Sequence, residues 1–404
     1  MKKRQHYFYF LLVIFLITNC TQLLEIDNIT LEENIVVKAI LTNEVKNHTV
    51  VLSNTIQIDA TEPNPLENAT VFITDDTGTV YNFQENENGE YTSITQFAAE
   101  SSKSYTLHIE TPKGIKYKSS SEQLPTTSEI NHLDFDVESD DNNQRVVVIK
   151  VNSILTNQNA NYYRYTYDET YKVRAIHWSP RRIKLLSENP YSFTTEDKDP
   201  DIDGVGFCYG NQKIKKIMVT ETKTLAEDRV AAFPIRTIPL DSYIIGLRYS
   251  IKVDQYVLNK NTYDYYELLS TFSDPDQIFS QVQLGNIPSN ISAETNISNA
   301  KVSGFFEVSS VYSKRFYINR KDITTTDFTN YVTTSACLDR PNPLIEDQFG
   351  RSPLLNLLEN GYIHFTNNPS NDPLDSNQPY ILIGKSCGDC TRVGQPVAPS
   401  FWID

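Results

Sequence analysis

Four of the five cysteines have a position and spacing that could do chemistry. Cys387 and Cys390 form a Cys-x-x-Cys motif, which can be a redox pair or half of a zinc site. No thioredoxin-like strand and helix follow it, and His364 is the only histidine nearby. We therefore predict two structural disulfides. A bridge across a two-residue loop constrains the unfolded chain least, so Cys387 and Cys390 are each expected to pair with Cys208 or Cys337.

An acidic segment in the middle of the chain resembles part of a calcium-binding loop. Asp199, Asp201 and Asp203 occupy positions 1, 3 and 5 of such a loop, and Gly204 occupies position 6, where a sharp turn is needed. Position 12 is Gly210 rather than the bidentate acid. Calcium is therefore one hypothesis for this segment, and a solvated acidic loop is the alternative.

A stripe of tyrosines could bind a ligand by stacking. Tyr163, Tyr165 and Tyr167 alternate along a predicted strand, so their rings lie on one face of it. Such a face can bind sugar rings or peptides. The alternative is packing in a core or across strands.

The motifs of common enzymes are absent from the sequence. We find no His-Glu-x-x-His, no Gly-x-Ser-x-Gly and no glycine loop of the phosphate-binding kind. Neighbouring acids say nothing about general acid–base catalysis in a chain with 51 of them. We predict that the protein is not an enzyme. A hydrolase stays open as an alternative, because catalytic groups meet in space rather than in sequence.

The first twenty residues indicate where the protein works. A basic start precedes an apolar run from Tyr7 to Ile17, which suits a signal-peptide core and is too short for a bilayer span of about 20 residues. The run ends in Ile17-Thr18-Asn19-Cys20, which resembles the lipobox of bacterial lipoproteins. We expect a lipoprotein signal peptide over residues 1–19, a lipid on Cys20 and a tether over residues 20–34.

The charge balance narrows the partners of the chain. The net charge is −15, and residues 1–19 contribute +3 without any acid, so the remainder carries −18. This balance argues against nucleic acid and against electrostatic adsorption to anionic lipid. Attachment to the membrane is therefore expected to come from the lipid on Cys20. Glu25 and Asp27 resemble the surface-export signal of Bacteroidota lipoproteins, and a solvated linker is the alternative reading of them.

The rest of the chain is predicted to be all-β with one short helix. Residues 35–125 carry short apolar runs separated by turn signals, which favours an immunoglobulin-like β-sandwich complete in itself. Residues 126–404 are predicted to form a larger β-rich domain with longer loops, in which residues 302–320 make two strands. Its one helix should begin at a cap, Asn261 or Thr262, and end at Ser273-Asp274-Pro275.

Several short segments of the chain follow one another in a characteristic order. They are Tyr249-Ser250-Ile251, Val253-Asp254-Gln255-Tyr256, Glu267-Leu268-Leu269, Gly285-Asn286-Ile287, Val302-Ser303-Gly304-Phe305-Phe306, Cys387-Gly388-Asp389-Cys390 and Pro399-Ser400-Phe401-Trp402. In this order they resemble a Bacteroidota outer-membrane lipoprotein family of unknown function, the DUF4249-like proteins. In that family the gene commonly lies beside one for a TonB-dependent transporter. The resemblance implies no catalytic residues.

The resemblance implies a function at the cell surface. We expect a lipid-anchored, surface-exposed protein of the outer membrane that acts as accessory partner of a TonB-dependent transporter in nutrient capture or import. The alternative is a structural or adhesive envelope lipoprotein without a role in transport. Long loops on a rigid sheet are where recognition is usually built, so residues 339–376 of the second region are expected to contact the transporter.

Overall fold

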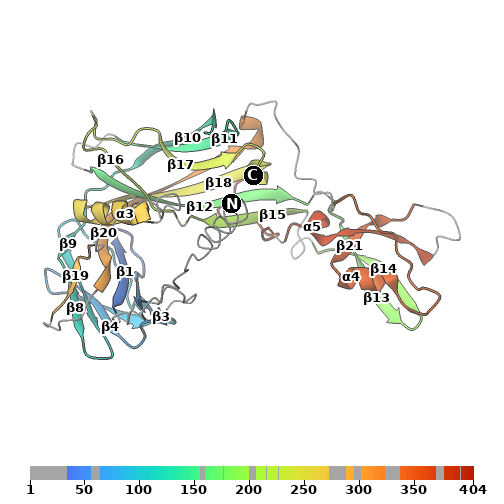
Figure 1. The fold of residues 1–404 in the computed structure, drawn as a ribbon, viewed down its shortest axis with the longest axis horizontal. Coiled ribbons are helices and arrows are strands. Elements are labelled where there is room, and N and C mark those ends of the chain that lie inside the picture. The colour runs from blue at the N-terminus through green and yellow to red at the C-terminus, as the bar shows by residue number, and fades with distance from the viewer. Residues whose placement is uncertain are drawn as a thin grey trace, which may run out of the picture.

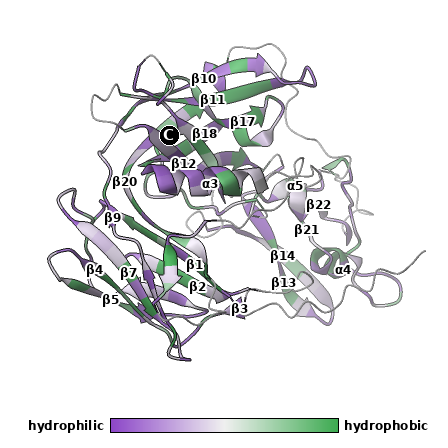
Figure 2. Ribbon diagram, turned by 60° about the vertical axis from the view of Figure 1, so that its left-hand side comes forward, coloured by the Kyte–Doolittle hydropathy of each residue, from purple (hydrophilic) through white to green (hydrophobic). Residues whose placement is uncertain are grey.

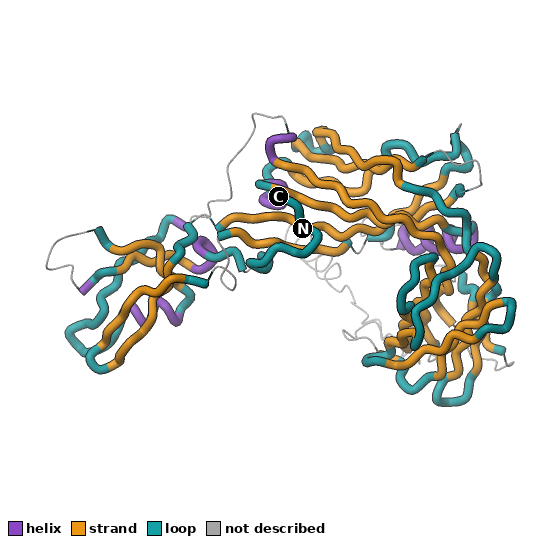
Figure 3. Tube along the Cα trace, turned by 180° about the vertical axis from the view of Figure 1, so that it is seen from behind, coloured by secondary structure: helices purple, strands orange, loops and turns teal. Residues whose placement is uncertain are grey.

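A computed structural model describes residues 34–55, 64–154, 160–175, 177–199, 206–214, 216–225, 227–272, 288–294, 302–323, 337–369, 377–391 and 393–404. These residues form three parts, which we call the sandwich, the central sheet and the distal lobe (Figure 1). Strands dominate all three parts, and the distal lobe projects from one end of the central sheet (Figure 3). The predicted all-β class with a short helix is confirmed.

The sandwich begins with nine strands from the first part of the chain: β1 (Ile35–Thr42), β2 (Thr49–Asn54), β3 (Asn64–Pro65), β4 (Thr70–Asp75), β5 (Val80–Glu85), β6 (Glu90–Ser93), β7 (Ser104–Glu110), β8 (Lys116–Ser119) and β9 (Glu122–Gln123). Every second residue of β7 is buried, as expected for a strand with one face on a core. Hydropathy alternates in the same way along many strands (Figure 2). The first half of β5 pairs with β4 and its second half with β6, so β5 joins the two sheets of the sandwich.

The sandwich is not complete within residues 35–125, which corrects the expectation. Strand β19 (Ile291–Ala293) pairs with β8, and β20 (Val302–Asn319) pairs in parallel with β1. Phe306 and Val308 of β20 are buried in the core of the sandwich. The close approach of β20 to β1 requires glycine at position 304, because a Cβ there would lie 1.9 Å from the carbonyl oxygen of Val37.

The central sheet consists of β12 (Tyr162–Arg174), β15 (Phe207–Lys213), β16 (Met218–Glu221), β18 (Arg248–Val257) and the second half of β20. A smaller sheet of β10 (Ile130–Ser139), β11 (Arg145–Ser153) and β17 (Phe233–Pro239) shares a core with one face of it. The short 3-10 helices η1 (Tyr243–Ile245) and η2 (Arg320–Asp322) lie beside these strands in the sequence. The two strands predicted over residues 302–320 are one continuous strand, which runs from the sandwich into the central sheet.

The predicted helix is present as α3 (Lys260–Phe272). Its first turn is capped by Asn259 rather than by Asn261 or Thr262, since the Asn259 Oδ1 accepts a hydrogen bond from the backbone N–H of Thr262 at 2.9 Å. The predicted end, Ser273-Asp274-Pro275, lies outside the described residues. Within the described residues, none of the helices combines the length and the apolar character needed to cross a membrane.

The distal lobe comprises the described parts of residues 177–199 and 337–391. It contains the strand pair β13 (Arg181–Glu188) and β14 (Tyr191–Asp197), the pair β21 (Tyr362–Asn367) and β22 (Tyr380–Gly384), and the short helices α4 (Pro353–Glu359) and α5 (Lys385–Gly388). The sandwich and the distal lobe meet opposite ends of β12. At one end Tyr163 pairs with Val257 of β18, which pairs with Ser310, where β20 leaves the sandwich. At the other end Val173 pairs with Cys208.

Candidate functional site

Two disulfides hold the distal lobe together and fix it to the central sheet. Cys208 pairs with Cys390 and Cys337 pairs with Cys387, each with a Cα–Cα distance of 5.6 Å. The prediction of two structural disulfides, in which both cysteines of the Cys-x-x-Cys motif reach back along the chain, is confirmed. Since all four sulfur atoms are in these bonds, the motif is neither a free dithiol nor half of a zinc site.

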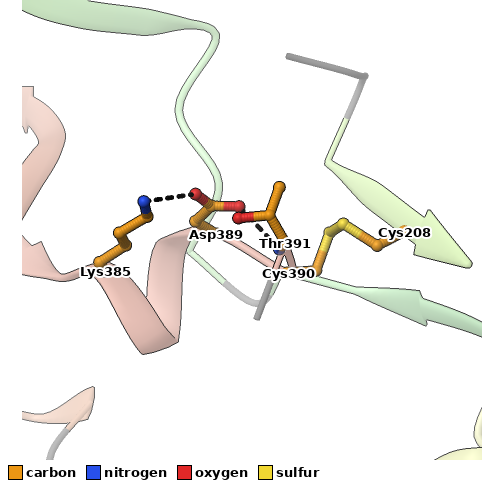
Figure 4. Close-up of a disulfide and its surroundings, with 5 residues drawn as sticks. All are labelled: Cys208, Lys385, Asp389, Cys390 and Thr391. Carbon is orange, nitrogen blue, oxygen red and sulfur yellow. Dashed lines mark hydrogen bonds and ion pairs between the residues drawn. A yellow bond between two sulfur atoms is a disulfide. The ribbon is translucent and has the colours of Figure 1, made fainter. Parts of the chain in front are cut away.

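The Cys208–Cys390 bridge lies at the junction of the distal lobe with the central sheet (Figure 4). Cys208 belongs to β15, and Cys390 lies two residues after the end of α5. The turn between α5 and the bridge is ordered by Asp389, whose Oδ1 accepts a hydrogen bond from the backbone N–H of Thr391 at 2.8 Å. Lys385, one helical turn earlier, lies 3.8 Å from the other carboxylate oxygen. The bridge therefore joins two locally ordered segments.

The apolar core of the distal lobe is small. One cluster of buried residues is Leu354, Tyr380 and Leu382, and a second combines Ile383 with the Cys337–Cys387 bridge. Hydrogen bonds connect the β13–β14 hairpin to the remainder, from the Tyr380 hydroxyl to the carbonyl of Phe193 at 3.3 Å and from the Tyr191 N–H to Glu346 at 3.3 Å. With so little apolar surface to bury, the lobe depends on its covalent links.

The distal lobe exposes large apolar side chains. Leu338 is 76% exposed, Phe349 70% and Leu186 59%. Phe349 is presented by a tight turn in which the Asp347 Oδ1 accepts hydrogen bonds from the N–H groups of Phe349, at 2.8 Å, and of Arg351, at 3.0 Å. The hydrogen bond from Arg351 helps to lower the pKa of Asp347, so the turn is stable while this carboxylate is ionised. Ordered apolar groups at the surface suit a protein–protein contact.

The family model for the domain of unknown function DUF4249 matches residues 22–315. The chain belongs to this family. The matched range covers the sandwich and ends within β20, so residues 337–391 of the distal lobe lie beyond it. The part of the resemblance that rests on residues 387–402 stays a prediction.

Other comparisons add little to the membership of DUF4249. No curated protein matches this chain. Among solved structures, the chain is similar to the adhesin InvE of Yersinia pseudotuberculosis, with 13% sequence identity and a TM-score of 0.15. The similarity covers 54% of this chain and 54% of the adhesin chain, so it spans about half the length of that protein.

The tyrosine stripe of this DUF4249 protein is part of the core. Tyr163, Tyr165 and Tyr167 are buried in the cluster between the central sheet and the β10–β11–β17 sheet. Tyr165 donates a hydrogen bond to Gln255 Oε1 at 2.9 Å. The hypothesis that the stripe binds a ligand at the surface is therefore wrong, and the alternative of core packing holds, because the smaller sheet covers this face of β12.

The calcium hypothesis falls largely outside the described residues. Asp201 and Asp203 are not described, and Asp199 is exposed at the end of the described segment. In the parts of the chain that the structure describes, no three His, Cys, Asp or Glu side chains gather in the way that a metal ion requires. Calcium binding stays a prediction. Cys20, the signal peptide and the tether up to residue 33 also lie outside the described residues.

The distal lobe contains a Ser–His–Asn series that the sequence did not indicate. The Ser179 Oγ lies 2.8 Å from Nδ1 of His364, and Nε2 of His364 lies 3.1 Å from Asn367 Oδ1. The order of groups resembles a nucleophile, a base and an orienting residue. However, Ser179 is only 3% exposed, and its Oγ also accepts a hydrogen bond from the Arg181 N–H at 3.3 Å. The series therefore acts as an internal tie between β13 and β21.

A buried ion pair joins the sandwich to the central sheet, and it too was not indicated by the sequence. Nη2 of Arg164 in β12 donates to both carboxylate oxygens of Glu307 in β20, at 2.8 and 3.1 Å. The hydroxyl of Tyr266 in α3 donates to the same carboxylate at 2.7 Å. The guanidinium lies 4.0 Å from the ring centroid of Tyr256 and 4.7 Å from that of Tyr266. The cluster thus connects β12, β18, β20 and α3 where β20 leaves the sandwich.

Proposed function

We propose that this chain is a lipid-anchored protein of the bacterial outer membrane, exposed at the cell surface, that acts as accessory partner of a TonB-dependent transporter in nutrient capture or import. The sequence supports the lipid on Cys20 through the lipobox-like end of the apolar run. The structural observation that carries the proposal is the braced distal lobe with its exposed Leu338 and Phe349. A fixed apolar surface of this kind suits a protein partner.

The arrangement of the three parts supports this assignment. Strand β1 runs toward the central sheet, because Thr42 pairs with Ser309 and the next residue, Ser310, already pairs with β18. Ile35 therefore lies at the end of the sandwich that is farther from the central sheet. Cys20 precedes Ile35 by fifteen residues, which can span at most about 50 Å. A lipid on Cys20 would keep the sandwich near the membrane and leave the distal lobe free to meet a neighbouring barrel.

Co-purification from detergent-solubilised outer membrane tests the partner. We expect a TonB-dependent transporter to co-purify with the unmodified chain and to be lost when Leu338 and Phe349 are both changed to serine. The matched control changes Val45 and Ile94 of the sandwich to serine, since these apolar residues are also strongly exposed. Equal loss in both double variants would contradict a contact through the distal lobe. Recovery of envelope polymers instead of a transporter would favour the structural or adhesive alternative.

The lipid anchor is tested separately. Cys20→Ser should leave the protein unprocessed or soluble, because three acyl chains on Cys20 would be its only stable link to the membrane. Unchanged fractionation of this variant with the outer membrane would overturn the lipoprotein assignment.

A further inference from the structure

Residues 393–404 lie across the outer face of the central sheet, by which we mean the face turned away from the β10–β11–β17 sheet. The segment meets the edge strand β15 through a pair of backbone hydrogen bonds between Tyr209 and Gln395, at 2.8 and 3.1 Å. Gly394 makes this approach possible, because a Cβ at that position would lie 2.3 Å from the backbone of Tyr209.

The end of this segment inserts aromatic side chains among cations and aromatic rings of the sheet. The Arg315 guanidinium lies 3.7 Å from the ring centroid of Phe401. The Trp402 ring contacts Tyr209 edge-on at a centroid distance of 5.0 Å and Tyr317 at 6.1 Å. The Tyr317 hydroxyl donates to the carbonyl oxygen of Phe401 at 2.6 Å. The sheet thus contacts the aromatic rings of both Phe401 and Trp402.

The acidic residue that follows is also recognised. Nζ of Lys172 in β12 lies 2.6 Å from Oδ1 of Asp404, and the Trp402 indole N–H donates to the same oxygen at 3.1 Å. The hydrogen bond from Lys172 lowers the pKa of Asp404, and the charge of Arg248 acts in the same direction. The site therefore favours an ionised carboxylate two positions after Trp402, the second of the two aromatic residues.

The outer face is basic, although the chain as a whole has a net charge of −15. Residues that pair directly in an antiparallel sheet share a face, so the pairings of β12, β15, β18 and β20 place the following cations on this side: Lys172, Arg174, Lys213, Arg248, Lys252 and Arg315. Lys172 also lies 4.9 Å from the ring centroid of Phe207, and Arg248 4.8 Å from that of Tyr317. The same pairings place two acids on this face, Asp168 at 3.9 Å from Lys213 and Asp254 at 2.9 Å from Lys252, so the cations outnumber the acids there. We call this set of cations and aromatic rings the outer platform.

The segment on the outer platform is only partly buried. Ile403 is 62% exposed, and Phe401 and Val397 are exposed as well. In the ion pair with Lys172 the Asp404 side chain is 70% exposed, and pairs at the surface contribute about 0–1 kcal/mol. Displacing residues 399–404 would therefore cost far less than disturbing the core beneath them.

We propose that the outer platform is a recognition site for an extended peptide segment of a partner protein, with two adjacent aromatic residues followed closely by an acidic residue, and that residues 399–404 occupy it within the same chain. The seated segment defines the chemistry that the platform accepts. A segment tethered to its own site has an effective concentration in the millimolar range, so it acts as a competitor that a partner must displace. This inference does not rest on the proposed transport function.

Binding of a labelled peptide to the whole chain tests the proposal. The probe is the hexapeptide Pro-Ser-Phe-Trp-Ile-Asp, which has the sequence of residues 399–404. The variant Phe401→Ala with Trp402→Ala removes the aromatic contacts of the segment with the platform. If this loss frees the platform, we expect saturable binding at least about tenfold tighter than to the unmodified chain, by fluorescence anisotropy. Equal binding to both proteins, or none to either, would overturn the proposal.

Two further substitutions in this double variant show whether the probe uses the platform. Arg315→Ala should weaken binding about tenfold, because it removes the cation that faces the Phe401 ring. Lys213→Ala is the matched control, since it removes a cation of the same face that pairs with Asp168 rather than with the segment. If the two substitutions weakened binding equally, the probe would be bound by the general positive charge of the surface, and the proposed site would be refuted. Self-association of the unmodified chain that is lost in Trp402→Ala would refute a separate partner protein.

Discussion

The sandwich and the distal lobe are both attached to the central sheet, but they are stabilised in different ways. The sandwich has a large core that includes Leu41, Leu52, Leu107 and Phe306, and its described residues contain no disulfide. The distal lobe has two small clusters and two disulfides. The comparison shows how the amount of apolar surface that a part can bury decides whether covalent links are needed.

The two junctions differ in the same way. β20 runs without interruption from the sandwich into the central sheet, and the buried pair of Arg164 and Glu307 lies where it crosses. The distal lobe is joined through the Cys208–Cys390 bridge instead. One junction should therefore be sensitive to the loss of a buried charge and the other to reduction.

The largest effect is expected from Arg164→Ala. This change leaves the Glu307 carboxylate buried without its counter-ion, and breaking such a pair costs about 3–5 kcal/mol. The free energy of unfolding, measured by chemical denaturation, should fall by this amount, with loss of hydrogen-exchange protection in both β1 and β18. The control is Lys150→Ala, which removes ion pairs to the exposed acids Asp136 and Glu138 and should cost about 0–1 kcal/mol. Similar costs for both variants would contradict the importance of the buried pair.

The second effect concerns the junction of the distal lobe. Replacing Cys208 and Cys390 together by serine removes a cross-link between segments 182 residues apart, which is expected to cost about 2–4 kcal/mol. The cost should fall on the distal lobe, because the sandwich and the central sheet retain their cores. Limited proteolysis should then cut the distal lobe first and leave a stable fragment with the sandwich. Simultaneous loss of all three parts would show that the distal lobe is not a separate unit.

Local patterns predicted more of the fold than of the contacts between distant segments. The alternation of β7 and the presence of α3 are set by neighbours in the sequence, so the strands and the helix could be predicted, although the residue that caps the helix was not. Loop entropy indicated that Cys387 and Cys390 each pair with Cys208 or Cys337, but only the structure shows which cysteine pairs with which. The continuous β20 was taken for two strands, because nothing local indicates that one strand serves two cores.

The residues of the candidate site show where sequence reasoning ends. The face of β12 that carries Tyr163 would be aromatic whether it bound a ligand or packed in a core. Only the position of the β10–β11–β17 sheet decides that this face is covered. Ser179 and His364 are 185 residues apart, and neither lies in a motif. Lys172 and Asp404 are separated by 232 residues. Pairs of this kind are defined by the fold, so no spacing in the sequence could reveal them.

A third prediction tests the sandwich without touching its core. Burial raises the pKa of Asp75, but hydrogen bonds from Thr77 and the Thr79 N–H outweigh this and hold it well below its ordinary range. Asp75→Ala leaves these donors without their acceptor, at an expected cost of about 2 kcal/mol at pH 7. Since the folded pKa is lowered, the contribution is present above pH ~4 and is lost as the pH falls below it.

Chemical denaturation at pH 7 and in acid measures this effect. The difference in unfolding free energy between the unmodified chain and Asp75→Ala should shrink in acid. Asp76→Ala is the control, because the neighbouring Asp76 is exposed and should change stability little. A constant difference at both pH values would show that ionisation of Asp75 is unimportant.

The smallest effect is a pH dependence confined to the distal lobe. Burial lowers the pKa of His364, and the nearby charges of Arg181 and Lys198 lower it further. The other polar groups that face the ring are Ser179, Asn367 and the edge of Tyr380. The folded state therefore prefers a neutral imidazole, whereas the unfolded chain takes up a proton as the pH falls through about 6.5. Stability of the lobe should be full above this pH and decline below it.

The size of this decline should differ between the sandwich and the distal lobe. Hydrogen-exchange protection of β21, corrected for the intrinsic pH dependence of exchange, should drop between pH 7.5 and 5.5 by an amount on the order of 1 kcal/mol. His364→Gln should remove the pH dependence, since glutamine can still hydrogen-bond to Ser179 but does not titrate in this range. The sandwich also contains a buried histidine with a lowered pKa, His48. Because the core of the sandwich is large, we expect its hydrogen-exchange protection to change little over this pH range. If hydrogen-exchange protection of the sandwich fell as much as that of β21, core size would not explain why the sandwich and the distal lobe differ in stability.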